Sequence, residues 1–411
     1  MKRYFTISLT AFAFSILNVL TFFLLGIITG NTALSGIFSI TYPLQFVASV
    51  LLAFFASASN IRGNKETNKN CVYTGIILGI IFGAVVFAIV AIFIDQYLVF
   101  MNIDPSVYRI FTLMAVGQLF LSHINNIISE KLYFENKDNL GNVCNLGFII
   151  LNVASVSISA LITKNELAIL LANLICLVIY VCVWLGFNIK KFKFDFSIVK
   201  NFKYESINIV GGIFMLLIYL FGFKIAFGFG EEYYIAISLV TLISDPLFDA
   251  TSIIGKIAKI DISQSCYNYK KALKYSSIIN ACYCALGIIL FFALFKFYNV
   301  RLEIGLIYLS IQIADILQSS LNINLQTFMQ LEYSPFKATL INLLKKALRT
   351  LLTVVIFSPF NTDIAQITCE ILGLLIYLML RYRNFKLDEN GFLIKKDKVK
   401  KIDKHKHEKV S

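Results

Sequence analysis

Apolar runs of about 20 residues, long enough to cross the roughly 30 Å of hydrocarbon in a bilayer as a helix, recur along the chain between short polar segments. No water satisfies the backbone inside a bilayer, so such runs must be helices rather than loops or open strands. Each run is apolar on all sides, so its length predicts the element better than any amphipathic period. The predicted spans cover residues 5–29, 33–58, 71–94, 108–130, 140–162, 166–188, 205–228, 233–255, 273–296, 303–328, 338–358 and 363–380.

This pattern predicts an all-α polytopic membrane protein of about twelve transmembrane helices in two six-helix lobes. The lobes echo each other, because Tyr42-Pro43-Leu44 in the second span has a counterpart in Asp245-Pro246-Leu247 of the eighth. Parallel repeats of this kind enclose a site between the two lobes. We predict an N-terminal lobe over 1–190, a cytoplasmic linker over 191–204, a C-terminal lobe over 205–382 and a basic disordered cytoplasmic tail over 383–411.

Composition and charge agree with a membrane location and predict an orientation. The chain is 58% hydrophobic and 15% charged, against about 25% charged in soluble proteins. The run from Phe5 to Thr29 is longer than the core of a signal peptide and is expected to stay as the first helix. Lys and Arg gather in alternate connections and after Arg381, which predicts a cell-membrane protein with both termini cytoplasmic. The net charge of +13 then needs no nucleic-acid partner.

Motifs of enzymes and metal sites are missing from the sequence. There is no HExxH, no GxxxxGK[ST] and no nucleophile elbow. The eight cysteines show no CxxC spacing and are expected to pack as small apolar side chains. We therefore predict no enzyme activity, no cofactor and no metal site.

Several segments resemble the multidrug and toxic compound extrusion (MATE) family. The opening is similar at Asn31-Thr32-Ala33-Leu34-Ser35-Gly36, at Pro43, and at Ala56–Asn60 with Arg62-Gly63-Asn64-Lys65. Ser129–Tyr133 through Asn142 resembles the connection between helices four and five of the family, and Ile341–Leu352 the start of helix eleven. The resemblance implies alternating access between two lobes and export from the cytoplasm. The same plan belongs to a wider flippase superfamily that includes exporters of lipid-linked oligosaccharides.

The first helix departs from the family. Many members carry a proton-binding Asp and a bending Pro there, and this chain has Thr21 and Ala11 or Ala13 at the matching positions. Asn18 lies nearby but cannot titrate. The missing Asp and Pro argue against a proton switch in the N-terminal lobe. The seventh span also lacks the mid-membrane acid that sodium-coupled members carry there.

Polar residues at membrane depth are candidates for coupling or binding, since an ionisable group there costs at least about 2.5–3.5 kcal/mol. Asp245 and Asp249 share one helix face beside Pro246, and Asp315 lies near the midplane between Gln312 and Gln318. The resemblance implies a coupling acid in this tenth helix. Alternatively, each acid is a protonated packing group. The ion-coupling or substrate-binding candidates are Asp245, Asp249, Asp315, Glu370, His123, Asn18 and Gln45.

Cations in the C-terminal lobe allow a second interpretation. Lys345 and Arg349, with Lys346, either precede the membrane entry of their helix or line a vestibule, and Lys224 either snorkels or contacts substrate. We expect an ion-coupled (H⁺ or Na⁺) exporter of amphipathic or cationic small molecules that acts as a monomer among membrane lipids. The alternative is a flippase for lipid-linked oligosaccharide or polysaccharide precursors. Cations facing the cavity would favour the flippase.

Overall fold

The computed structural model describes residues 3–13, 15–16, 44, 46–47, 53–54, 65–189, 194–296 and 300–396. Most of the predicted first and second spans lies outside these residues, although residues 3–13 are helical. The remaining elements follow in chain order. They are α4 (Lys65–Phe100), α5 (Pro105–Phe134), α6 (Asp138–Thr163), α7 (Glu166–Ile189), η2 (Phe196–Ile198), α8 (Val199–Phe229), α9 (Glu231–Ser263), α10 (Tyr269–Leu294), α11 (Leu302–Phe328), η3 (Met329–Tyr333), α12 (Pro335–Val355), α13 (Asn361–Asn384), β1 (Phe385–Leu387) and β2 (Leu393–Lys395).

Polar caps begin several helices at the ends of the bundle. The Asp104 carboxylate accepts from the Ser106 backbone N–H at 2.9 Å, and Pro105 follows as the first residue of α5. The hydrogen bonds from Ser106 lower the pKa of Asp104. The Asn268 side chain accepts from the Lys271 N–H at the start of α10, and Ser334 caps α12 ahead of Pro335. These caps satisfy backbone donors where the chain turns between apolar runs.

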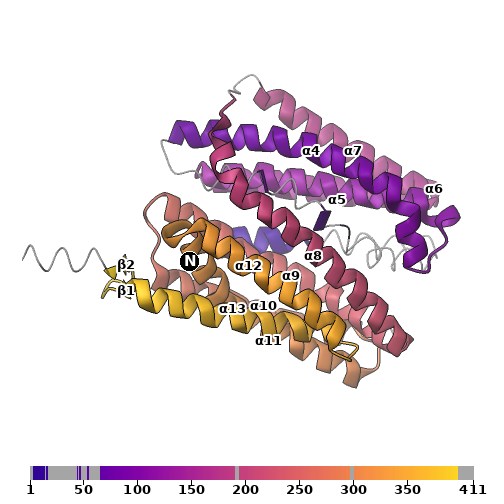
Figure 1. Cartoon of the computed structure of the whole chain (residues 1–411). Coiled ribbons are helices and arrows are strands. Elements are labelled where there is room, and N and C mark those ends of the chain that lie inside the picture. Colours follow the sequence, from indigo (N-terminus) through magenta and orange to yellow (C-terminus); the bar gives the residue numbers. More distant parts are fainter. Residues whose placement is uncertain are drawn as a thin grey trace, which may run out of the picture.

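The helices form two groups (Figure 1). Helices α4 to α7 lie side by side in one group, and α9 to α13 form the other, while α8 crosses between the groups and packs on α12 and α13. One apolar core fills the first group around Ile94, Ile128 and Phe148. The larger core fills the second group around Leu247 and Phe291, with Ile7 from the first helix packed into it. The lobe boundaries at 190, 204 and 382 stay a prediction.

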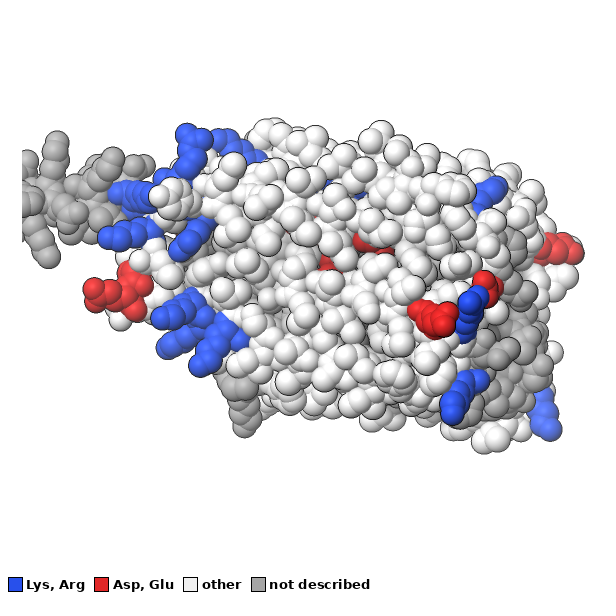
Figure 2. Space-filling view, turned by 90° about the horizontal axis from the view of Figure 1, so that it is seen from below, with Lys and Arg blue, Asp and Glu red and all other residues white. Residues whose placement is uncertain are grey.

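The outer surface is apolar, as a bilayer requires. Ile162 is 77% exposed and Phe357 is 90% exposed. Nine of the described helices are long and apolar enough to cross a membrane. On the face drawn in Figure 2, Lys and Arg gather at the end where β1 and β2 lie, and a broad, largely uncharged band covers the middle. The chain is thus an all-α polytopic membrane protein, as the sequence predicted.

Helix α12 is amphipathic, but its apolar face points outward and its charged face points inward, the reverse of a helix in a soluble protein. Leu344 and Leu351 on its outward face are each 60% exposed, whereas Arg349 is buried. Its predicted span, 338–358, carries too many charges on the inward face to pass as a simple apolar run. The charges are tolerated because they face the protein interior rather than lipid.

Two local features differ from the sequence prediction. Helix α9 continues to Ser263, eight residues beyond the predicted end of its span at 255, so that Lys256 and Lys259 belong to a helix and not to a loop. Residues 385–395, assigned from sequence to the disordered tail, instead form an antiparallel hairpin that pairs Phe385 with Lys395. Its buried Phe385 packs on Phe328. This apolar contact could not be predicted from a segment rich in charged residues.

Candidate functional site

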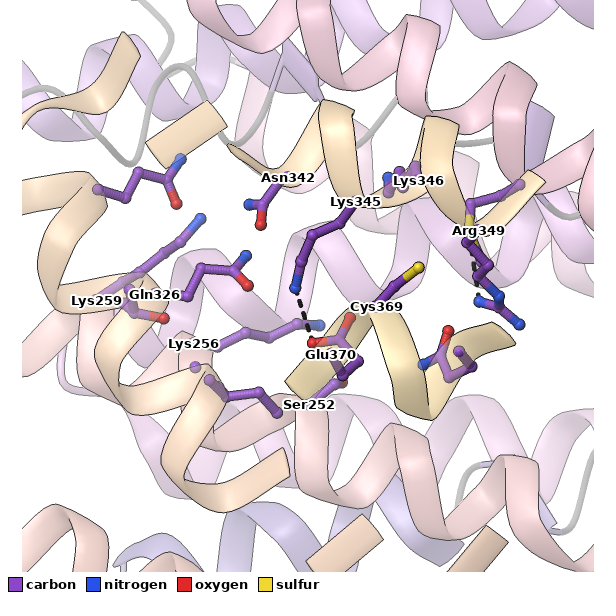
Figure 3. A pocket seen from close by; sticks show the side chains of 16 residues that line it. Ser252, Lys256, Lys259, Gln326, Asn342, Lys345, Lys346, Arg349, Cys369 and Glu370 are labelled. Carbon is purple, nitrogen blue, oxygen red and sulfur yellow. Dashed lines mark hydrogen bonds and ion pairs between the residues drawn. The ribbon is translucent and has the colours of Figure 1, made fainter. Parts of the chain in front are cut away.

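A cavity of about 450 Å³ lies among α8, α9, α11, α12 and α13 (Figure 3). Polar side chains from four of these helices and from η3 turn toward it. Its lining residues are Met215, Ser252, Gly255, Lys256, Lys259, Ile323, Gln326, Thr327, Gln330, Asn342, Lys345, Lys346, Arg349, Gln366, Cys369 and Glu370.

Helical spacing places the charged groups on the cavity side. Residues 342, 345, 346 and 349 of α12 recur at three- and four-residue steps and so share one face of the helix. Ser252, Lys256 and Lys259 do the same on α9, and Gln366 and Glu370 on α13. The charged side chains therefore come from three helix faces that meet, and not from loops.

The cavity lining is strongly cationic. Five of its residues carry a positive charge, namely Lys256, Lys259, Lys345, Lys346 and Arg349, and Glu370 is the acid among them. Lys345 Nζ lies 2.7 Å from Glu370 Oε2, and Lys256 forms an ion pair with Glu130 of α5. Lys259, Lys346 and Arg349 have no ion-pair partner among the described residues.

Arg349 is held in place by uncharged neighbours. Its guanidinium carbon lies 5.5 Å from the centroid of the Tyr219 ring, and Nη1 lies 3.7 Å from the sulfur of Met215. Asp315 and Asp363 also act on it electrostatically, without forming an ion pair with it. Arg349 thus keeps hydrogen-bond donors available on a side chain that is 5% exposed.

Two carboxylates, Asp315 and Asp363, do not line the cavity but act electrostatically on Arg349, which does. The Gln318 amide donates to Asp315 Oδ1 at 2.7 Å, and the Gln312 amide donates to Asp363 Oδ1, also at 2.7 Å. The sequence predicted both glutamines beside Asp315, but only Gln318 bonds to it. Asp363 was missed because it opens its helix. Its spacing of three and seven residues from Gln366 and Glu370 was the available signal.

The acids of α9 lie apart from the cationic cavity. Asp249 accepts a hydrogen bond from the Ser15 hydroxyl at 2.6 Å and lines a second cavity of about 50 Å³. Asn126, Ser129, Glu130 and Lys256 also line this smaller cavity. Asp245, one turn earlier on α9, lines neither cavity.

The other predicted site residues lie in different parts of the structure. His123 is half-buried on α5, within electrostatic reach of Lys256. Lys224 is exposed, with its ammonium 4.1 Å from the centroid of the Phe100 ring, and does not line the cavity. Asn18 and Gln45 lie outside the described residues. Lys345, Lys346 and Arg349 line the cavity, whereas Lys256 and Lys259 were missed because the sequence placed them in a loop.

No family model and no curated protein sequence match the chain. Its structure, however, is similar to solved transporter structures. A crystal structure of MATE in complex with MaD5 matches with a TM-score of 0.66 at 14% identity, over 92% of this chain and 95% of the other. The outward-facing conformation of a multidrug resistance MATE family transporter of the MOP superfamily has a TM-score of 0.66 at 11% identity, over the same shares of the two chains.

A third similar structure comes from Pyrococcus furiosus. It is a MOP superfamily transporter whose pocket is described as having reverse polarity that suggests a different function. It matches with a TM-score of 0.64 at 13% identity, over 92% of this chain and 95% of its own. Identities this low establish the architecture and not the substrate. The protein is a polytopic all-α membrane protein with the fold of the MATE transporters.

Proposed function

We propose that the protein is an alternating-access transporter whose cavity binds an amphipathic anion, such as a lipid-linked diphosphate, and exports it from the cytoplasm of the cell. The observation that carries this proposal is the cavity lining, with five cations and one acid. Of the two functions that the sequence allowed, this is the flippase for lipid-linked precursors.

The chemistry of the lining suits phosphate oxygens. Lysine ammonium groups act as point charges toward phosphate, and an arginine guanidinium can donate two parallel hydrogen bonds to it. Attraction between charges is stronger in a cavity shielded by protein and lipid than in water. Lys259, Lys346 and Arg349, which have no ion-pair partner in the described part of the chain, are the charges available for a substrate. A cationic drug would meet repulsion from the same groups. The reversed pocket polarity ascribed to the Pyrococcus furiosus transporter is a parallel case on the same fold.

An ion-coupled (H⁺ or Na⁺) exporter of cationic or amphipathic small molecules is the second candidate. The observation that favours it is a pair of carboxylates outside the cationic lining, the buried Asp315 and the half-buried Asp363. These groups can also supply ion coupling to an anion exporter. Coupling and substrate charge are therefore separate questions.

Ligand binding to the purified protein in nanodiscs tests the substrate class. Farnesyl diphosphate serves as the anionic probe and a lipophilic cationic dye as its opposite. Lys346→Gln is the most informative variant, because the loss of this ammonium leaves no carboxylate without its ion-pair partner. We expect it to weaken diphosphate binding about tenfold or more, in line with roughly 1.5–3 kcal/mol for a hydrogen bond to a charged group.

Lys224→Gln is the matched control, since this lysine lies outside the cavity and should leave diphosphate binding unchanged. Tight binding of the cationic dye, together with no binding of the diphosphate, would reject the proposal in favour of cation export.

A further inference from the structure

Lys256 belongs to both cavities and to the contact between α5 and α9. Its side chain lines the large cationic cavity and the small one beside Asp249. Its ammonium pairs with Glu130, which projects from α5 in the first helix group. The Glu130 side chain is 12% exposed and that of Lys256 is 34% exposed, so the pair is partly shielded from solvent.

Other polar contacts at this end also join the two helix groups, but they do not reach the large cavity. Arg3 bridges Asp138 of α6 and Asp261 of α9, and the Gln264 amide donates to Asn136 at 3.2 Å. None of these residues lines the large cavity. Among the described cations that line it, Lys256 is the one paired with a carboxylate of α5. Lys345 pairs instead with Glu370, inside the same cavity wall.

We propose that Lys256 links occupation of the cavity to separation of the two helix groups. An anionic group that enters the cavity competes with Glu130 for the Lys256 ammonium. The four-carbon stem of lysine lets the ammonium turn from one partner to the other. Binding then releases the α5–α9 ion pair and favours the conformation in which these helices part. This inference rests on the proposed anionic substrate.

The competition predicts opposite effects of the two partners on ligand affinity. Glu130→Gln removes the competitor, so farnesyl diphosphate should bind about fivefold more tightly or better, the lower end of typical coupling between sites. Lys256→Gln removes a ligand contact, so the same probe should bind less tightly. A pair that only holds the fold together would shift the affinity in the same direction in both variants.

A disulfide across the neighbouring contact reports on the separation itself. Asn136→Cys with Gln264→Cys places one thiol on each side of the contact in which the Gln264 amide now lies 3.2 Å from Asn136 Oδ1. The rate of oxidative linkage is followed by mass spectrometry of the linked peptide, which distinguishes it from products of the native cysteines. We expect farnesyl diphosphate to slow linkage about fivefold or more. In the Lys256→Gln and Glu130→Gln backgrounds, linkage should be slow already without the probe.

Lys259→Gln is the matched control on the same helix. It also lines the cavity but has no partner on α5 among the described residues, so it should weaken probe binding and leave the linkage rate without probe unchanged. If the probe binds wild type and depends on Lys346, but Glu130→Gln does not tighten it, the role of Lys256 is rejected while the substrate class stands. If the probe does not bind wild type at all, both proposals are rejected.

Discussion

At the residue scale, the cavity is lined mainly by cations, whereas Asp315 and Asp363 do not line it but act electrostatically on Arg349. Asp315 is 4% exposed and bonded to Gln318, whereas Lys346 borders the open cavity. A buried carboxylate can exist in protonated or ion-bound form more easily than as a bare charge. We therefore propose that the acids supply coupling and that the cations contact the substrate.

We predict that Asp315→Asn, Asp249→Asn or Asp245→Asn abolishes gradient-driven transport in proteoliposomes while the protein still reaches the membrane. Asparagine keeps the volume and the hydrogen bonding but removes the charge that responds to H⁺ or Na⁺. Glu303→Gln is the control, because Glu303 is an acid whose side chain is 78% exposed, away from both cavities. Transport in the triple Asn variant that still responds fully to pH and sodium would eliminate coupling through these acids.

Two glycines offer a matched test of close packing. A Cβ on Gly222 of α8 would collide with the Thr362 hydroxyl of α13, whereas a Cβ on Gly147 of α6 meets nothing within 4 Å. We predict that Gly222→Ala lowers the free energy of unfolding by about 1–3 kcal/mol through overpacking. Gly147→Ala should raise it by about 0.5–1 kcal/mol through helix propensity. Denaturant unfolding in detergent measures both, and equal effects would refute the close contact.

At the scale of elements, the sequence predicted the helices well and their ends poorly. Length and apolarity located each described span, because lipid demands a continuous apolar run. The same criterion ended the predicted span of α9 at residue 255, because charged side chains that face a cavity resemble a loop in the sequence. Spacing of 249, 252, 256 and 259 at three and four residues was the evidence that the helix continued.

The C-terminal hairpin could not be predicted from the composition of the tail. Phe385 is 3% exposed and lies 5.0 Å from Phe328 between ring centroids. The hairpin tip also joins the start of α10, where the Asn268 amide donates to the Asn390 carbonyl at 2.8 Å. Phe385 thus ties the hairpin to α11, and the hydrogen bond between Asn268 and Asn390 ties it to α10.

We predict that the chain tolerates loss of residues 397–411 but not of the hairpin. The sequence assigned 383–411 to a disordered tail, and the strand pairing at Lys395 limits the dispensable part to 397–411. Phe385→Ala should lower the free energy of unfolding by about 3–5 kcal/mol, the usual cost for a buried Phe. Thermal unfolding of both variants in detergent provides the measurement. A stable protein truncated before Phe385 would show that the hairpin contributes little.

At the scale of the whole molecule, the sequence could predict the fold class but not the site. Spans, loop charges and the MATE-like segments all pointed to one architecture, which the structure confirms. The polarity of the cavity depends on which faces of α9, α12 and α13 meet, and this is a tertiary property. Hence Lys345 and Lys224 looked equivalent in sequence, yet one lines the cavity and the other covers Phe100.

The orientation in the membrane follows from the distribution of charge between the two ends of the bundle. The end that carries the hairpin is rich in Lys and Arg (Figure 2). The backbone of Lys270 bonds to Gly391 there, and Arg383 lies in the last turn of α13, just before β1. At the opposite end Arg301 lies near Glu232 and Glu303, so acids balance the cation. Lys and Arg near short loops favour the cytoplasmic side. We therefore predict that the hairpin end is cytoplasmic.

Reporter fusions test this orientation. Fusions after residues 65, 135, 197, 265 and 400 should report the cytoplasm, because each follows or precedes a helix at the hairpin end, and fusions near 102 and 231 should not. The two outer positions serve as internal controls for insertion, because they lie at the opposite ends of the same helices and should report the other side of the membrane. An external signal at 197 would place the connection between the predicted lobes on the wrong side. That result would overturn both the orientation and the division into six and six spans, and with it the expectation that substrate enters the cationic cavity from the cytoplasm.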